Sequence, residues 1–221
     1  MSRVFDPVLR NLRELALRMG SRAEAILDKA LRSVWERNAE LAGEVKADDL
    51  EIDRLDLEID DEVLKTLALQ APVAEDLREV IAIKMIANDL ERVGDLARNI
   101  SKSAARLSLR PMTVTPRTLR DLGRDTQHAL SEALNAFGNT DPDVARSVLK
   151  DDETIDAEED VVVLAALQAI PEHPENASEA VDMILIAKHL ERIADHATNI
   201  AESVILVAEA RNVKHSTKLA R

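Results

Sequence analysis

The 221-residue sequence contains no cysteine and no tyrosine, and it has only one tryptophan and two phenylalanines. Without cysteine the chain has no disulfides and no thiolate metal sites, which is typical of a reducing compartment. Because aromatic residues are so scarce, alanine, leucine, isoleucine and valine must fill the interior. That composition suits closely packed helices better than a sheet that relies on aromatic cross-strand pairs. The composition therefore predicts an all-α protein.

Further absences restrict the function. There is no run of about 18 apolar residues, so we expect no transmembrane segment, and the N-terminus lacks the apolar stretch of a signal peptide. A formal net charge of −13 disfavours binding to nucleic acid. No phosphate-binding glycine loop and no G-x-S-x-G nucleophile motif are present, so we do not expect an enzyme. We expect a cytoplasmic protein whose ligands are cations or basic protein surfaces.

A long internal repeat is the main sequence feature. Residues 90–100 recur as residues 190–200, and seven of the eleven positions are identical. A period of one hundred residues indicates duplication of a whole structural unit rather than a solenoid repeat. Residues 49–53 have a related copy at 152–156. The sequence therefore predicts two similar halves.

Apolar periodicity and the prolines predict six helices. Their expected ranges are 7–42, 45–69, 73–108, 116–138, 142–169 and 175–212. In the third and sixth helices the apolar steps alternate between four and three, which indicates left-handed packing. We predict two tandem three-helix bundles related by a pseudo-twofold internal duplication, with domains at 1–110 and 111–221.

Particular residues are expected to set the helix ends. The pairs Asp6-Pro7, Thr115-Pro116 and Asp141-Pro142 each read as an N-cap followed by proline at the first helical position. Gly43 is expected to end or kink the first helix. We expect Ala71-Pro72, Pro111 and the pair Pro171 and Pro174 to lie at helix junctions.

Acidic pairs at helical spacing form the candidate site. Like charges four residues apart cost a helix about 0.2–0.5 kcal/mol per pair, so four such pairs at matching places in both halves need a reason. Clusters of carboxylate oxygens suit hard cations. The candidate metal ligands are Glu91, Asp95, Glu191, Asp195, Asp49, Asp53, Asp152 and Asp156.

The same pairs also have a simpler interpretation. In a chain with 32% charged residues, acidic pairs often lie on solvated faces and are neutralised by nearby bases. Asn99 and Asn199 follow the acidic pairs by one turn, either as ligands or as ordinary surface residues. His196 flanks only the second pair, so a metal role for it would be confined to one half.

The sequence resembles the PhoU family of bacterial phosphate-signalling regulators. The resemblance covers nearly the whole chain and includes Phe5-Asp6, Met19-Gly20, Asp76-Leu77-Arg78 and the doubled Leu-Glu-Arg-x-x-Asp-x-x-x-Asn-Ile. It implies two three-helix bundles, often dimeric, with iron, zinc, manganese or magnesium on the acidic faces. It also implies an adaptor between the ATPase subunit of a phosphate ABC transporter and a sensor histidine kinase.

The resemblance places the metal ligands at Glu91, Asp95, Glu191 and Asp195, with Asp49, Asp53, Asp152 and Asp156 as contributors. It also gives Asp76 and Arg78 a role in partner contact or helix capping. Lys188 lies one turn before the second acidic pair, so we expect the first half to be the better metal site. Two alternatives to the adaptor remain open. They are a carboxylate-bridged metal-dependent phosphohydrolase and a metal-free helical scaffold.

Overall fold

The computed structural model describes residues 6–110 and 116–214, and within these ranges the regular structure is entirely helical. The helices are α1 (Asp6–Trp35), α2 (Ala39–Gln70), α3 (Ala74–Ser108), α4 (Arg117–Asn139), α5 (Pro142–Glu172) and α6 (Ala177–Glu209), with the short 3₁₀ helix η1 (Pro174–Asn176) before α6. The predicted fold class is confirmed.

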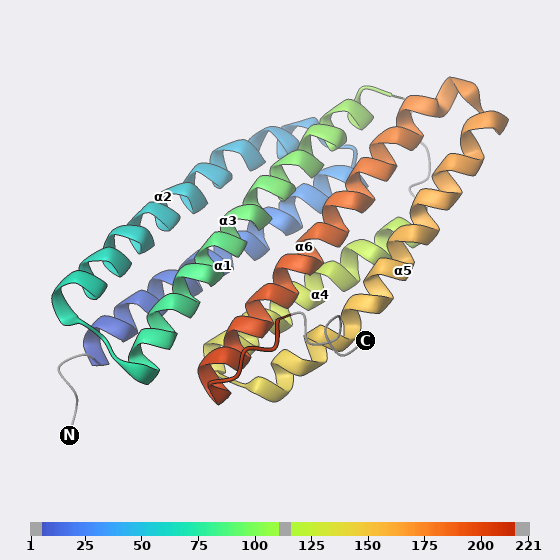
Figure 1. Cartoon of the computed structure of the whole chain (residues 1–221). Coiled ribbons are helices and arrows are strands. Elements are labelled where there is room, and N and C mark those ends of the chain that lie inside the picture. The colour runs from blue at the N-terminus through green and yellow to red at the C-terminus, as the bar shows by residue number, and fades with distance from the viewer. Residues whose placement is uncertain (1–5, 111–115, 215–221) are drawn as a thin grey trace.

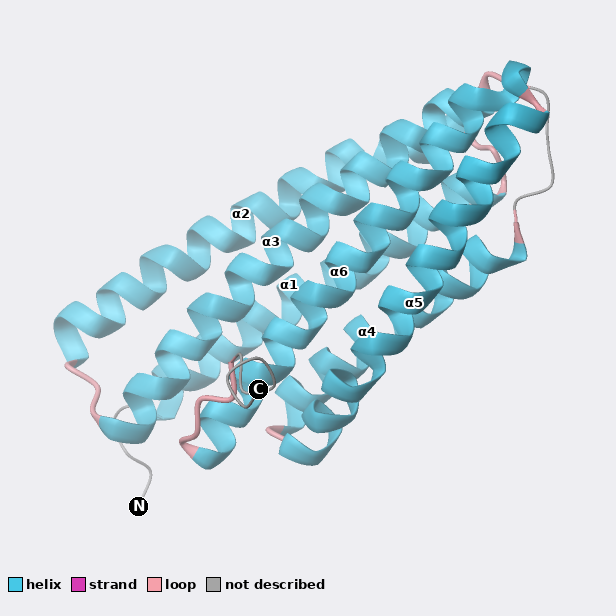
Figure 2. Cartoon of the chain, turned by 45° about the vertical axis from the view of Figure 1, so that its right-hand side comes forward, coloured by secondary structure: helices cyan, strands magenta, loops and turns pink. Residues whose placement is uncertain are grey.

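The helices form two three-helix bundles that lie side by side with their long axes in a similar direction (Figures 1 and 2). The first bundle contains α1, α2 and α3, and the second contains α4, α5 and α6. Helices α3 and α6 meet along the middle of the molecule, while α2 and α5 lie on the outer sides. The two tandem bundles are as predicted. The domain division at 110 and 111 adjoins residues outside the described ranges and stays a prediction.

The first connection differs from the prediction. Helix α1 ends at Trp35, and α2 already includes Gly43. Arg37 adopts a left-handed conformation with φ of 50°, which stops α1. The Asn38 side chain then accepts hydrogen bonds from the backbone N–H groups of Glu40 (3.0 Å) and Leu41 (3.1 Å). The expected break at Gly43 was wrong because the asparagine cap starts α2 earlier, and a single glycine is tolerated inside a helix.

The prolines fulfil their expected roles only in part. Asp141 caps α5, accepting from the N–H groups of Asp143 (2.9 Å) and Val144 (3.2 Å), with Pro142 following it as predicted. Pro116 is itself the N-cap of α4 rather than its first helical residue, and Thr115 lies outside the described residues, as do Phe5 and Pro111. Pro171 lies in the last turn of α5, so the junction comes later than expected.

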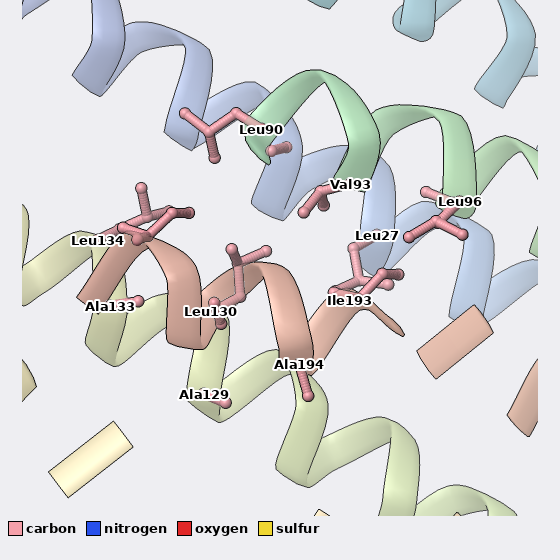
Figure 3. Close-up of a cluster of buried hydrophobic side chains, with 14 of the residues drawn as sticks. Leu27, Leu90, Val93, Leu96, Ala129, Leu130, Ala133, Leu134, Ile193 and Ala194 are labelled. Carbon is pink, nitrogen blue, oxygen red and sulfur yellow. The ribbon is translucent and has the colours of Figure 1, made fainter. Parts of the chain in front are cut away.

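One apolar core runs through both bundles. The seam residues Leu90, Val93 and Ile193 are fully buried. Figure 3 shows Leu90 and Val93 of α3 facing Leu27 of α1, Leu130 of α4 and Ile193 of α6. The predicted apolar seam of α3 and α6 is therefore buried. Because the apolar stripes of α3 and α6 are used between the bundles, the acidic pairs lie against the outer helices. Among the described helices, none combines the length and hydropathy needed to cross a membrane.

Candidate metal-binding faces

The predicted acidic pairs of each bundle lie on neighbouring helices and interact electrostatically. We call the set on α2 and α3 the first acidic face and the set on α5 and α6 the second acidic face. Electrostatic repulsion acts between helices within each set, from Asp95 on Asp49 and from Asp195 on Asp152. The first acidic face is Asp49, Asp53, Glu91 and Asp95, and the second is Asp152, Asp156, Glu191 and Asp195.

An arginine lies within the first acidic face. The Arg98 guanidinium contacts Oδ2 of Asp49 at 2.7 Å and Oδ1 of Asp95 at 2.6 Å, so it joins α2 to α3. Asp49 is only 1% exposed. Burial raises the pKa of the Asp49 carboxyl, and the charge of Arg98 opposes that rise. A protein cation therefore neutralises the deepest carboxylate of this face.

Gly94 explains why Asp49 can be so deeply buried. A Cβ at position 94 would lie 2.9 Å from Oδ1 of Asp49 and 3.0 Å from Cδ1 of Ile52. The missing side chain thus lets α2 approach the middle of α3 closely. The equivalent position in the second bundle is Ala194, and there Asp152 is more exposed than Asp49. Positions 94 and 194 thus differ by one methyl group.

A second arginine adds to the neutralisation of the first acidic face. Arg92 contacts Oε2 of Glu91 at 3.2 Å and Oδ2 of Asp95 at 3.3 Å, although its side chain is largely exposed. Burial raises the pKa of Glu91, and the charge of Arg92 counteracts this effect. Three of the four carboxylates in the first acidic face, Asp49, Glu91 and Asp95, therefore have an arginine partner.

The second acidic face is built from the same carboxylates with different neighbours. Burial and the nearby charges of Asp156 and Asp195 raise the pKa of Asp152 to about 6. Burial and then Asp195 raise the pKa of Glu191. Within residues 6–110 and 116–214, no lysine, arginine or histidine forms an ion pair with Asp152, Asp156 or Glu191. Among the described residues, these three carboxylates therefore lack the arginine partners found in the first acidic face.

Lys188 is held to one side of the second acidic face. Its Nζ atom contacts Oε2 of Glu159 at 2.8 Å, and Glu159 is almost completely buried. The lysine charge reaches Glu191 and partly offsets the rise in the pKa of Glu191. The expectation that Lys188 makes the second half the weaker site stays a prediction, because this ammonium is paired with a carboxylate outside the four while its charge still acts on Glu191.

The chemistry of the two faces fits a metal ion unequally. The second acidic face offers carboxylate oxygens, the donors that hard cations prefer. In the first acidic face the Arg98 guanidinium already lies between Asp49 and Asp95. Over the described part of the chain, no three aspartate, glutamate or histidine side chains are gathered as a preformed metal site. Metal binding at either face would therefore require the carboxylates to move together.

The neighbouring asparagine and histidine of α6 serve the interface between the bundles. Asp89 of α3 lies 2.9 Å from Nδ1 of His196 and accepts a hydrogen bond from Nδ2 of Asn199 at 3.2 Å. Their suggested metal roles are not supported by this geometry, because both side chains point to α3. Asn99 instead accepts from Nζ of Lys102 at 2.9 Å.

Asp76 and Arg78, the predicted partner residues, lie at the start of α3. Asp76 is in the first turn, where its negative charge favours the helix N-terminus. Arg78 is half-buried, and its Nε atom has no hydrogen-bond partner among the described residues. The location of Asp76 agrees with the helix-end role, while partner contact remains a prediction.

A further carboxyl pair was not anticipated. Asp125 of α4 lies near Glu158 of α5, and the pKa of Asp125 is lowered mainly by the hydrogen bond from Arg124 and to a smaller extent by Glu158. Burial and the charge of Asp125 raise the pKa of Glu158 to about 7. No repeat or short motif marks this pair, because its members come from different helices. The difference between Arg98 and Thr198, in contrast, was visible in the repeat itself.

Comparison with known proteins extends the similarity over both bundles. The PhoU domain family matches residues 16–104 and 119–204. A Xylella fastidiosa protein named phosphate-specific transport system accessory protein PhoU homolog is 36% identical over 185 residues, which cover 84% of this chain and 77% of that protein.

Two crystal structures are similar in fold. PhoU from Pseudomonas aeruginosa has a TM-score of 0.90 and 33% identity, covering 94% of this chain and 100% of that one. The phosphate transport system regulatory protein PhoU from Streptococcus pneumoniae has a TM-score of 0.88 and 27% identity, covering 95% and 99%. With two family matches, one in each bundle, this chain belongs to the PhoU family.

Proposed function

We propose that this chain is a regulatory adaptor of phosphate uptake. It links the ATPase subunit of a phosphate ABC transporter to a membrane sensor histidine kinase, and it damps uptake and starvation signalling when phosphate is ample. It acts through protein contacts and catalyses no reaction. The observation that carries this proposal is the match of both bundles, over nearly the whole chain, to proteins named as accessory or regulatory components of phosphate transport.

The charge of the chain supports an adaptor over a phosphate carrier. With a net charge of −13, the surface repels inorganic phosphate, so a phosphate signal would reach the chain through its partners. Helix α2 is especially acidic, since residues 48–62 contain nine acidic residues and a single arginine. Partners with basic contact surfaces complement this helix.

An exposed row of leucines on α2 supports a protein contact there. Leu50, Leu57 and Leu64 are seven residues apart and 50%, 67% and 65% exposed. A row at this spacing lies along one side of a helix, and exposed apolar patches mark interaction surfaces. We propose that the transporter ATPase docks on this α2 leucine row through an apolar surface with basic margins.

A pull-down of the transporter ATPase subunit under phosphate-replete conditions tests this contact. We expect a Leu57→Gln/Leu64→Gln variant to lose most of the binding. The matched control is Leu167→Gln, which alters the repeat-equivalent position of Leu64 on α5 and is 51% exposed in the native chain. Undiminished capture of the ATPase by the α2 variant would contradict docking on this helix. A starvation-gene reporter that stays repressed after deletion of the chain would contradict the regulatory role.

We also propose that divalent or trivalent ions such as iron, zinc, manganese or magnesium bind the acidic faces, and that the chain forms a homodimer. A bound ion would neutralise the clustered carboxylates and tie two helices together. Metal analysis of protein purified without chelator should show a loss in the variant with alanine at Glu91, Asp95, Glu191 and Asp195. Equal metal content in both proteins would contradict the metal proposal. Light scattering of the native chain tests the dimer.

A further inference from the structure

The two bundles differ in the length of their first helix. Asn38 caps α2 and Asp141 caps α5, and the family match begins at residue 16 in one half and at 119 in the other, so residue 14 corresponds to residue 117. Helix α1 begins at Asp6, whereas α4 begins at Arg117, so α1 is longer at this end by about two turns. Figure 1 shows α5 and α6 reaching beyond the start of α4.

The first bundle uses the extra turns of α1 to cover its own core. Leu12 is fully buried, and Leu9, one turn earlier, packs against the same core. Beside them, Nη1 of Arg13 contacts Oε1 of Glu79 at 3.0 Å, which ties these turns to α3. A short helical segment with two leucines on one side and an arginine next to them therefore occupies this position in the first bundle.

The equivalent position in the second bundle is an apolar cavity of about 240 Å³. Position 166 is alanine where the first half has Val63, and position 180 is alanine where it has Val80. The shorter α4 and these smaller side chains together create the cavity. Its apolar lining comes mainly from α5 and α6 and includes Val162, Ala165, Ala166, Ala169, Ile170 and Met183.

The size of the cavity and the charges around it indicate what would fill it. Pockets for whole small molecules usually measure about 300–1,000 Å³, so about 240 Å³ suits one or two side chains of a partner better. Glu179 lines the cavity and is paired with Arg37 of the same chain. His173 also lines it, and the adjoining Glu172 and Glu175 are exposed. Basic residues of a partner would complement these two glutamates.

We infer that this cavity is a docking site for a short amphipathic helix of a partner protein, which takes the position that the first turns of α1 take in the first bundle. Two apolar side chains one turn apart enter the cavity, and basic residues beside them face Glu172 and Glu175. The site lies on the second bundle and the α2 leucine row lies on the first, so two partners can bind at once. The inference does not depend on a role in phosphate uptake.

A peptide with the sequence of residues 2–13 tests this inference, because it carries the two leucines and the arginine that the first bundle uses. It is labelled with fluorescein and titrated with the full chain, with fluorescence anisotropy as the readout. The native chain should bind it saturably. Ala166→Leu/Ala169→Leu fills the cavity and should weaken binding by about tenfold or more, because the anchoring side chains lose their pocket. Ala47→Leu, at an exposed alanine of α2, is the matched control and should bind like the native chain.

A second variant covers the case in which the filled cavity disturbs folding. Ala165 lines the cavity and is exposed, so Ala165→Trp should block entry and reduce binding to a similar extent at an unchanged melting temperature. Glu172→Gln/Glu175→Gln should also weaken binding, and more strongly at low salt than at high salt.

Three outcomes would overturn the inference. The first is the lack of saturable peptide binding by the native chain, and the second is equal binding by the native chain and both cavity variants. The third is self-association of the native chain, seen by light scattering, that Ala165→Trp abolishes while the peptide does not bind, because a second copy would then occupy the cavity. Capture of the ATPase through the α2 leucine row is a separate measurement, so it can fail while this docking site stands.

Discussion

Replacing Gly94 with alanine tests how tightly α2 and α3 pack beside the first acidic face. In a helix interior this change normally stabilises a protein by about 1 kcal/mol, because alanine favours the helix and restricts the unfolded chain. Here the new Cβ would lie 2.9 Å from Oδ1 of Asp49 and 3.0 Å from Cδ1 of Ile52. Both contacts are shorter than van der Waals packing allows, so α2 side chains must move.

The expected net effect follows from these opposing contributions. Overpacking of a tight core costs about 1–3 kcal/mol, and the lower part of that range applies because both neighbouring atoms are side-chain ends. Gly94→Ala should therefore leave the free energy of unfolding unchanged or lower it by about 1 kcal/mol. For a chain of this size, such a loss lowers the melting temperature by about 2–4 °C.

Urea unfolding of Gly94→Ala measures this effect, and Ile52→Val provides a second background because it removes the Cδ1 atom. The alanine should be better tolerated in the Ile52→Val background than beside the native isoleucine, with a coupling of about 0.5–1 kcal/mol in the double-mutant cycle. Ala194→Gly is the reciprocal control and should lose about 1 kcal/mol. A gain of the full ~1 kcal/mol in Gly94→Ala alone, without coupling to position 52, would refute the close packing.

Three further changes test other parts of the structure. In the folded state the pKa of Glu158 is raised from 4.5 to about 7. Between these pH values the folded state keeps a proton that the unfolded state has lost, so the free energy of unfolding falls as the pH rises from about 4.5 to about 7. Glu158→Gln should therefore be more stable than the native chain by about 1–2 kcal/mol at pH 8, allowing for solvent screening, and nearly equal to it at about pH 5, as measured by urea unfolding. A constant difference between these pH values would exclude the titration of Glu158. His196→Leu copies the residue at position 96 but removes a partner of Asp89, and it should lower the free energy of unfolding by about 1–2 kcal/mol. That loss should disappear in an Asp89→Leu background. Ile193→Ala at the fully buried seam should cost about 2–5 kcal/mol by the same assay, and a loss below about 1 kcal/mol would show that the seam is loosely packed.

Periodic features made most of the fold predictable from the sequence. The seam of α3 and α6 follows from apolar steps of four and three, and the two bundles follow from the long repeat. Errors occurred where one capping residue or backbone conformation sets a helix end. At the first connection, the Asn38 cap and the left-handed Arg37 outweigh the expected break at Gly43. Asparagine is common both in caps and on helix surfaces, so its type alone does not place the helix end.

The acidic residues of the candidate site were predictable, but their state was not. Glu91 and Asp95 share a helix side by their spacing alone, and their repeat copies do the same. Whether a carboxylate is neutralised depends on side chains that reach it from any direction, as Arg98 of α3 reaches Asp49 of α2.

Substitutions beside duplicated carboxylates can change their charged partner without changing the carboxylates themselves. Arginine at position 98, where the second half has threonine, adds a permanent cation, and glycine in place of alanine at position 94 allows Asp49 to lie beneath that cation. These two differences belong together, because a buried aspartate without its arginine would be costly. The same acidic motif is thus joined by an internal arginine in one half and has threonine at that place in the other.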